Sequence, residues 1–283
     1  MAKGIYVGID NKAKKIKNLY VGVGYLAKRI TKAYVGVGGK ARLCYCLDYI
    51  AYYGTAENLL VGRSNLAAAS TSDYAIFGGG RGNYEWSLMT TDFYDANLTK
   101  TQGSYLSDLR FNLAAVSSNN KAFFAGGQYS YTGFLNNVEI YNTYNSYYTS
   151  SLRYNKAELG ASKVGNYALF AGGATTGSMH DNTASVDGFD TSSIRTLVTD
   201  LSEARSSLGG ANTPSYALFA GGINTTGNGT NRVDAYNSSL TQSLPDTIKN
   251  SVRSVGASAG KKALFFASNA VTAFDDSLTS YLV

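Results

Sequence analysis

The residues of this chain that could take part in covalent chemistry are few. His180 is the one histidine among 283 residues, and Asp181 follows it. A histidine next to a carboxylate is a candidate general base, but catalysis also needs a nucleophile and groups that stabilise the reacting charge. The sequence places no serine next to this pair that could act as the nucleophile. We therefore predict that the chain has no catalytic residue and is not an enzyme.

The two cysteines, Cys44 and Cys46, lie two residues apart and hence on one face of a strand. A disulfide between them would be strained, so we interpret them as a reduced structural pair. A zinc site usually needs four ligands, and a thiol nucleophile needs a base. With one histidine in the chain neither is supported, and we expect no metal and no cofactor.

Three arginines could instead bind an anionic ligand. Arg63, Arg110 and Arg205 each stand three residues before the leucine of a recurring Arg-x-x-Leu pattern. In a repeat protein they would ring one channel mouth. The alternative, which we favour, is that they pair with acidic residues on neighbouring strands, since many ion pairs are purely structural. The candidate partners are Asp92, Glu139, Asp187 and Asp234.

Four long segments, each of which follows a Gly-Gly pair, differ from one another: 81–89, 128–134, 174–182 and 223–231. Unlike loops on a repeated frame usually carry binding specificity, and aromatic residues flanked by Asn, Gln and Arg suit sugar rings or a protein contact. The competing interpretation is that these aromatic side chains fold back over the core. The predicted ligand- or receptor-binding residues are Tyr84, Trp86, Tyr129, Tyr131, Phe134, His180, Asn224, Arg63, Arg110 and Arg205.

A repeat positions these residues. Its clearest copy, Tyr-Ala-Leu-Phe-Ala-Gly-Gly at 167–173, recurs at 74–80, 121–127 and 216–222 and, in decayed form, at 262–268. The shared alanines are 47, 46, 49 and 46 residues apart, a period typical of propeller blades and of other repeat architectures. The run is short, aromatic and bounded by glycine, which favours a strand buried on both faces.

Each repeat is predicted to hold four antiparallel strands, the first of small residues that permit close backbone approach. The composition, with 23 Tyr and 31 Gly, favours strands and turns. We therefore expect an all-β chain in which 59–283 forms a β-propeller of about five four-stranded blades, closed into a ring that leaves no sheet edge exposed. One phenylalanine of each repeat should be buried between sheets: Phe77, Phe124, Phe170, Phe219 and Phe265.

These residues resemble the kelch repeat, in which a hydrophobic strand ending in Gly-Gly is followed by a Tyr and, about six residues later, by a Trp. The first two parts match. The Trp is absent, because Trp86 is the one Trp of the chain, and Arg195 and Gln242 lie six residues after Phe189 and Tyr236. We describe 59–283 as kelch-like, and the resemblance brings no known partner with it.

Residues 1–44 form a different, basic module. Residues 1–42 hold ten Lys or Arg against one acidic residue, whereas the remainder holds 15 basic against 18 acidic residues. A Tyr-Val-Gly run recurs every 14 residues, at Tyr6, Tyr20 and Tyr34, and each repeat is predicted to form a β-hairpin. A lone hairpin is marginally stable, so the three should pack together or with other chains. Residues 45–58 are predicted to be a connecting strand segment.

This short repeat resembles the Tyr-Val-Gly-Val and Ala-Lys-Lys-Ile-Lys runs at the start of tail-associated proteins of bacteriophages and prophages of Gram-positive bacteria. The resemblance covers 4–45 and implies a segment that attaches a variable distal domain to a particle. Alternatives for the lysines are a solvated strand face and nucleic-acid binding, which the strict alternation disfavours. The predicted attachment residues are Lys14, Lys15, Lys17, Lys28, Arg29, Lys32 and Arg42.

The functional hypothesis is a receptor-binding protein at the tail tip of a phage or phage-like particle, homo-oligomeric on that particle. The basic module would bind other tail or baseplate proteins, and the propeller would bind a bacterial surface glycan or protein. An intracellular kelch-like interaction module is the alternative. A glycan-cleaving propeller is disfavoured, because such enzymes need paired carboxylates and the sequence offers no such pair.

The expected location is the virion, after assembly in the bacterial cytoplasm. No apolar run approaches membrane-spanning length, and no signal-peptide core follows the first residues. We expect neither membrane insertion nor nucleic-acid binding.

Overall fold

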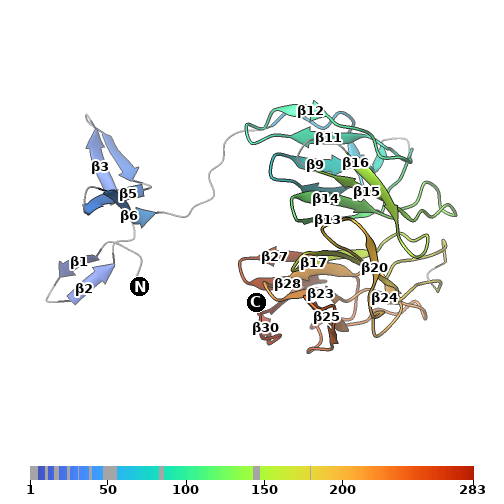
Figure 1. Cartoon of the computed structure of the whole chain (residues 1–283). Coiled ribbons are helices and arrows are strands. Elements are labelled where there is room, and N and C mark those ends of the chain that lie inside the picture. Colours follow the sequence, from blue (N-terminus) through green and yellow to red (C-terminus); the bar gives the residue numbers. More distant parts are fainter. Residues whose placement is uncertain are drawn as a thin grey trace. The chain divides into compact units, whose positions relative to one another are not determined.

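The computed structural model describes the strands between Tyr6 and Cys46 and then residues 56–82, 86–142, 147–178 and 180–283 (Figure 1). The chain divides into two compact units, residues 1–55 and 56–283. Every regular element in the described ranges is a strand. No helix in these ranges is long and apolar enough to span a membrane.

The first unit consists, in its described residues, of three two-stranded antiparallel hairpins. They are β1 (Tyr6–Ile9) with β2 (Lys12–Lys15), β3 (Leu19–Val23) with β4 (Leu26–Ile30), and β5 (Lys32–Val37) with β6 (Lys40–Cys46). The register repeats too, with the glycine of each Tyr-Val-Gly run opposite an alanine: Gly8–Ala13, Gly22–Ala27 and Gly36–Ala41. Each 14-residue repeat is therefore one hairpin, because the same Gly–Ala pair lies at the same distance from every turn.

Most of the predicted attachment residues lie on these strands. Those on β2, β4, β5 and β6 are Lys14, Lys15, Lys28, Arg29, Lys32 and Arg42. Lys17 lies outside the described residues, as do the side chains of all seven. Their role in attachment stays a prediction.

The second unit contains five four-stranded antiparallel sheets in its described residues, and the strands of each sheet lie side by side in chain order. The first sheet has β8 (Ala67–Ser70), β9 (Ala75–Gly78), β11 (Thr91–Tyr94) and β12 (Lys100–Gln102). The second has β13 (Ala114–Ser118), β14 (Lys121–Ala125), β15 (Asn137–Tyr141) and β16 (Tyr147–Ser151). The third has β17 (Gly160–Val164), β18 (Tyr167–Ala171), β19 (Val186–Phe189) and β20 (Arg195–Leu197).

The fourth sheet has β22 (Gly209–Asn212), β23 (Tyr216–Ala220), β25 (Val233–Asn237) and β26 (Gln242–Ser243). The fifth has β27 (Val255–Ala259), β28 (Lys262–Ala267), β29 (Ala270–Phe274) and β30 (Ser280–Leu282). Two short ladders join β7 (Arg63–Ser64) to β10 (Arg81–Gly82) and β21 (Arg205–Ser206) to β24 (Ile223–Asn224). The prediction of an all-β chain with four-stranded antiparallel sheets is confirmed.

The hydrophobic core lies between successive sheets. The phenylalanine of each second strand packs on the sheet before it, so that Phe170 meets Val138 and Ile140 of the second sheet, and Phe265 meets Leu218 of the fourth. The phenylalanines buried in this way are Phe124, Phe170, Phe219 and Phe265. The prediction that Phe77 is buried between sheets is wrong, because its side chain is only half-buried. Its sheet is the first, so no preceding sheet covers it.

One line of backbone hydrogen bonds links the starts of the five sheets. Each bond joins equivalent residues of neighbouring repeats, with N···O distances of 3.1, 2.9, 2.8 and 3.3 Å. The donors and acceptors are Asn112 N to Asn65 O, Glu158 N to Asn112 O, Ser207 N to Glu158 O, and Ser254 N to Ser207 O. The first strands of successive sheets consequently lie side by side.

The first strands approach one another closely because they carry small residues. A Cβ added to Gly210 on β22 would lie 2.0 Å from the carbonyl oxygen of Ala161 on β17, and one added to Gly256 on β27 would lie 2.3 Å from the oxygen of Gly210. No side chain larger than hydrogen fits there without a backbone shift. The small residues of the repeat therefore set the spacing between sheets.

The last sheet is exposed on one face. Val255 on β27 is 69% exposed and Phe266 on β28 is 52% exposed. In the fourth sheet the equivalent face, which includes Ala211 and Leu218, is covered by Phe265. Closure of the sheets into a ring stays a prediction.

Candidate ligand site

The three predicted arginines do not face a ligand. The side chain of each is 0% exposed and forms an ion pair with an acidic residue on the third strand of its own repeat. The pairs are Arg63–Asp92 at 2.7 Å, Arg110–Glu139, and Arg205–Asp234 at 2.7 Å. The favoured interpretation, that these arginines pair with acidic residues, is therefore confirmed. Their assignment as ligand-binding residues is wrong, because their guanidinium groups are buried in these ion pairs.

Lys156 occupies the same place in the third repeat and pairs with Asp187 at 3.1 Å, again with both side chains 0% exposed. Burial lowers the pKa of the Lys156 amine, and the Asp187 carboxylate opposes this shift. Burial also lowers the pKa of the Arg110 guanidinium, to about 10, so Arg110 is still charged at neutral pH. Buried charges of this kind need their partners, because an unpaired charge is costly in the interior.

The fifth repeat departs from this scheme. Val252 and Thr272 stand at the positions of the cation and the acid. In place of the acid, the Thr272 hydroxyl accepts a hydrogen bond from the Lys249 backbone N–H at 3.2 Å. An arginine is still present in this repeat, but it is Arg253, one residue later.

Each of the first three of the four unlike loops contacts the loop that follows it in the sequence. The Ser87 hydroxyl donates to the Tyr129 carbonyl at 2.8 Å, and the Asn182 amide donates to the Ile223 carbonyl at 3.0 Å. Between them, Gly177 lies so close to the Tyr131 carbonyl that a Cβ there would be 2.7 Å from its oxygen. We call the segments 81–89, 128–134, 174–182 and 223–231 the loop collar, of which 83–85 and 179 lie outside the described residues.

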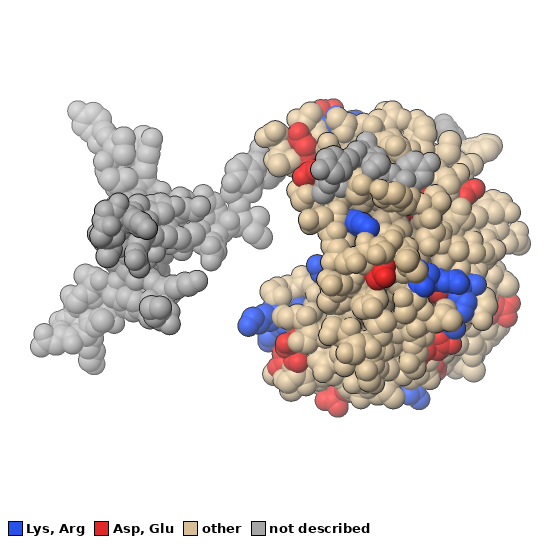
Figure 2. All heavy atoms as spheres, viewed as in Figure 1, with Lys and Arg blue, Asp and Glu red and all other residues tan. Residues whose placement is uncertain are grey.

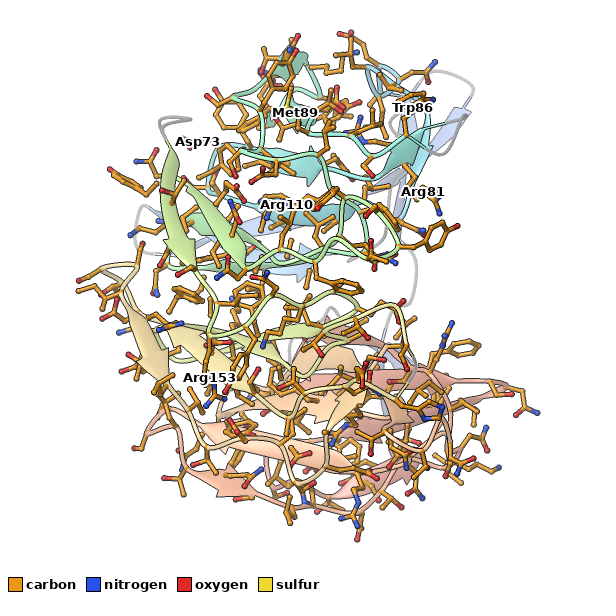
Figure 3. All side chains as sticks on the ribbon, turned by 90° about the vertical axis from the view of Figure 1, so that its right-hand side faces the viewer. Asp73, Arg81, Trp86, Met89, Arg110 and Arg153 are labelled. Atoms are coloured by element: carbon orange, nitrogen blue, oxygen red, sulfur yellow. The ribbon has the colours of Figure 1, made fainter. Side chains whose placement is uncertain are left out.

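Three of the predicted aromatic contact residues are exposed on this collar. Trp86 is 74% exposed, Tyr129 56% and Tyr131 67%. In Figure 3, Trp86 and Arg81 lie on the same side of the molecule, whereas Arg110 lies between the ribbons. On the face of the second unit that Figure 2 shows, which is not the collar face, charged side chains form scattered islands among uncharged ones. A partner of the collar would meet the exposed aromatic side chains of Trp86, Tyr129 and Tyr131.

The other predicted contact residues on these loops differ in exposure and contacts. Phe134 is only 8% exposed and packs against Ala157 and Ala174, so its assignment as an exposed contact is wrong. It fills the space beneath its own loop, as long loops often do. Tyr84 lies outside the described residues. His180 is exposed, with Nδ1 at 2.8 Å from the Thr225 carbonyl oxygen, so the next loop orients its ring.

Asn224 has a structural role in its loop. Its Oδ1 accepts the backbone N–H groups of Thr226 and Asn228, each at 3.1 Å. Its amide donates to Glu203 Oε1 at 3.1 Å. The side chain therefore holds its own loop in place, and the ligand-binding assignment of Asn224 stays a prediction.

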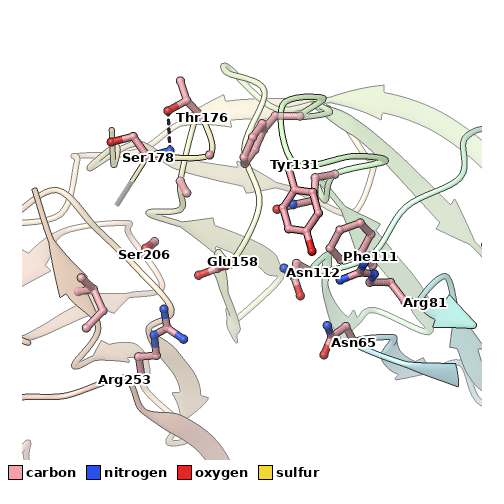
Figure 4. Close-up of a pocket in the computed structure, with 15 residues that line it drawn as sticks. Asn65, Arg81, Phe111, Asn112, Tyr131, Glu158, Thr176, Ser178, Ser206 and Arg253 are labelled. Atoms are coloured by element: carbon pink, nitrogen blue, oxygen red, sulfur yellow. Dashed lines mark hydrogen bonds between the residues drawn. The ribbon is translucent and has the colours of Figure 1, made fainter. Parts of the chain in front are cut away.

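A polar cavity of about 190 Å³ opens beside the collar, where the starts of the first strands meet (Figure 4). Collar residues line part of this central cavity, and its wall includes Asn65, Arg81, Phe111, Asn112, Tyr131, Glu158 and Arg253. The Arg81 guanidinium lies 4.6 Å from the ring centre of Phe111 and 5.6 Å from that of Tyr131. These rings orient the cation through cation–π contacts.

Asn65, Asn112 and Glu158 in the cavity wall, and Ser207 next to the lining residue Ser206, have left-handed backbones. Their φ angles are 54°, 53°, 54° and 54°. Asn adopts this conformation readily, whereas Glu does so rarely. Such residues recur at functional sites, where the surrounding structure holds them in place. The same residues, together with Arg253, line a further open hollow of about 440 Å³.

Sequence reasoning missed Arg253, Glu158, Asn65 and Asn112. A signal for them exists in the repeats, in the two residues that follow the recurring cation. There the sequence reads Ser-Asn, Phe-Asn, Ala-Glu, Ser-Ser and Arg-Ser, although the leucine or valine that comes next is preserved. Variation at one place in an otherwise regular repeat marks a surface where the repeats need not be alike.

Fold and site together define an all-β repeat protein with a loop-built face and a polar central cavity. The cavity holds no cluster of three His, Cys, Asp or Glu able to bind a metal, nor does any other part of the described chain. No family model matches the sequence, and no curated protein matches it. A solved structure of YjhT is similar, with a TM-score of 0.61 and 12% identity over 97% of this chain and 95% of that chain. At this identity the likeness concerns the fold alone.

Proposed function

We propose that this chain is a receptor-binding protein at the tail tip of a phage or phage-like particle. Residues 1–44 attach it to other tail or baseplate proteins, and residues 59–283 form a kelch-like β-propeller of five blades that binds a glycan of the bacterial surface. The protein acts by binding, without catalysis, as a homo-oligomer on the virion.

The observation that carries the proposal is the loop collar. Four loops of different sequence rise from near-identical sheets, contact one another, and leave Trp86, Tyr129 and Tyr131 exposed. Exposed rigid aromatic side chains contribute nothing to the core, so a cluster of them indicates a contact surface.

A hollow of about 490 Å³ beside Tyr129 extends this surface, and it is lined by Met89, Ser107, Asp108 and Leu109. Apolar walls with a hydroxyl and a carboxylate at hand suit a sugar ring, which has apolar faces and polar edges. This chemistry favours a glycan over a charged polymer.

The Lys-rich hairpins support the attachment part of the proposal. Three repeats with one register make three equivalent hairpins, and single hairpins are too small to be stable alone. Packing against one another or against partner chains provides the missing burial.

The test is adsorption of the labelled full-length protein to susceptible cells. Trp86→Ala and Tyr129→Ala should each reduce binding severalfold without changing the melting temperature, since both side chains are exposed. Tyr148→Ala is the matched control, because Tyr148 is 55% exposed on β16, outside the collar. Unchanged adsorption of the Trp86→Ala, Tyr129→Ala double variant would refute the assignment of this surface. Loss of binding after protease treatment of the cells would show that the receptor is a protein and not a glycan.

A further inference from the structure

The fifth repeat contains an arginine that the fold does not use. In the first, second and fourth repeats an arginine is buried and paired with an acid. In the fifth repeat the equivalent position is Val252, and the arginine has moved one residue on, to Arg253. A shift of one residue in an extended segment turns a side chain to the opposite face. Arg253 accordingly lines the central cavity and not the sheet interior.

The Arg253 guanidinium has no ion-pair or hydrogen-bond partner among the described residues. Its place at the cavity edge is visible in Figure 4. A guanidinium presents five N–H donors in a planar fork that matches a carboxylate. The fifth repeat has Thr272 at the position where the other repeats have an acid that pairs with the cation. Arg253 is therefore available to a ligand.

The other polar groups of the cavity are also available in part. Glu158 uses one oxygen, Oε2, to accept the Ser207 hydroxyl, which leaves Oε1 without a partner in the described chain. The side-chain amides of Asn65 and Asn112 make no hydrogen bond to described residues either. Together they offer acceptors and donors suited to hydroxyl groups.

The charge of Arg253 selects the ligand class. Its guanidinium carries one positive charge and has no ion-pair partner among the described residues. One carboxylate balances this charge, whereas a phosphate ester carries a charge between −1.5 and −2 at neutral pH. The cavity volume of about 190 Å³ is large enough for several water molecules. One small ligand fits, or the terminal residue of a longer chain.

We infer that the central cavity binds a hydroxylated carboxylic acid of the size of one sugar acid, with its carboxylate on Arg253. Its hydroxyl groups bond to Glu158, Asn65 and Asn112. This inference goes beyond the proposed function, because it concerns the isolated protein and a site separate from Trp86 and Tyr129. If the Trp86→Ala, Tyr129→Ala double variant adsorbed to cells normally, the proposed receptor surface would be refuted, but the inference about the cavity would not be affected.

The test is calorimetric titration of the full-length protein with glucuronate and galacturonate, and with glucose and galactose as neutral counterparts. At least one of the two acids should bind at least tenfold more tightly than its neutral counterpart. Arg253→Gln should weaken that binding by about tenfold or more, since a charge-assisted bidentate contact is lost. Raising the salt concentration should also weaken it.

Arg195→Gln is the matched control, because Arg195 is exposed on β20 and outside the cavity; it should leave binding unchanged. Should Arg253→Gln lower the melting temperature, Arg253→Lys keeps the charge without the fork and must still bind the acid more weakly. Equal affinity for acid and neutral sugar, binding by neither acid, or full affinity in Arg253→Gln would each overturn the inference. Tighter binding of glucose 6-phosphate than of glucuronate would overturn the choice of a carboxylate.

Discussion

Arg205 and Asp234 meet at 2.7 Å inside the fourth repeat, although 29 residues separate them in sequence. The same carboxylate accepts the Ser202 backbone N–H at 2.8 Å and the Gln242 side-chain amide at 2.7 Å. One buried acid thus joins the entry to the repeat with its third and fourth strands. Equivalent pairs occur in the first three repeats, which makes this contact part of the repeat itself.

Asp234→Asn should lower the free energy of unfolding by about 3–5 kcal/mol, because it leaves the Arg205 charge buried and uncompensated. Urea denaturation measures the loss. Asp200→Asn is the matched control, since Asp200 pairs with Arg153 at a site where the two side chains are 49% and 24% exposed. That change should amount to about 1 kcal/mol or less. Equal denaturation midpoints for the two variants would contradict a stabilising role of the buried pair.

Phe170→Ala should lower the free energy of unfolding by roughly 3–5 kcal/mol, because a fully buried ring between the second and third sheets is replaced by a cavity. Phe266→Ala removes a ring of the same size that is 52% exposed, and it should lose about 1 kcal/mol or less. Thermal unfolding of the two variants compares them directly. A Phe170→Ala protein as stable as the parent would show that the sheets are not packed as described.

Gly210→Ala should destabilise the protein by about 1–3 kcal/mol or more, since the new methyl group forces β22 away from β17. Gly62→Ala is the control, because a Cβ there meets nothing within 4 Å. The control should stay within about 0.5 kcal/mol of the parent. Chemical denaturation gives both values, and coincident curves would argue against the close approach of the first strands.

Phe134→Ala and Trp86→Ala should separate core covering from recognition. Phe134 is buried against Ala157 and Ala174, so its removal should lower stability by about 3 kcal/mol. Trp86 is 74% exposed, and its removal should change stability by about 0.5 kcal/mol at most. Differential scanning calorimetry provides the comparison. A large loss in Trp86→Ala would support the interpretation in which this side chain shields the core.

Deletion of residues 1–44 should abolish incorporation into particles and leave the second unit folded. The reason is that the chain divides into two compact units and that the excess of basic residues lies in 1–42. The measurements are immunoblotting of purified particles and circular dichroism of the truncated protein. Normal incorporation of the truncated chain would refute the attachment role and shift weight to an intracellular interaction module.

Local patterns in the sequence were enough to predict the strands and much of their packing. The recurring Ala-x-Phe run, ended by Gly-Gly, alternates and terminates as a buried strand must, so four antiparallel strands per repeat follow from spacing alone. The acidic partners of Arg63, Arg110 and Arg205 could also be named, because a regular repeat keeps the same offset between first and third strands. The 14-residue hairpins were predictable for the same reason.

Only the tertiary structure decided which side chains share a site. Phe134 and Trp86 lie on similar aromatic loops, yet one is buried and one exposed, because burial depends on how neighbouring loops pack. Arg253 and Glu158 come from repeats about 95 residues apart in the printed sequence, and they line one cavity since the first strands converge. The place of their sheets in the chain also explains why Phe77 is only half-buried and why Phe266 is exposed. A repeat pattern treats all copies alike, whereas the first and last sheets each lack the neighbour that covers the others.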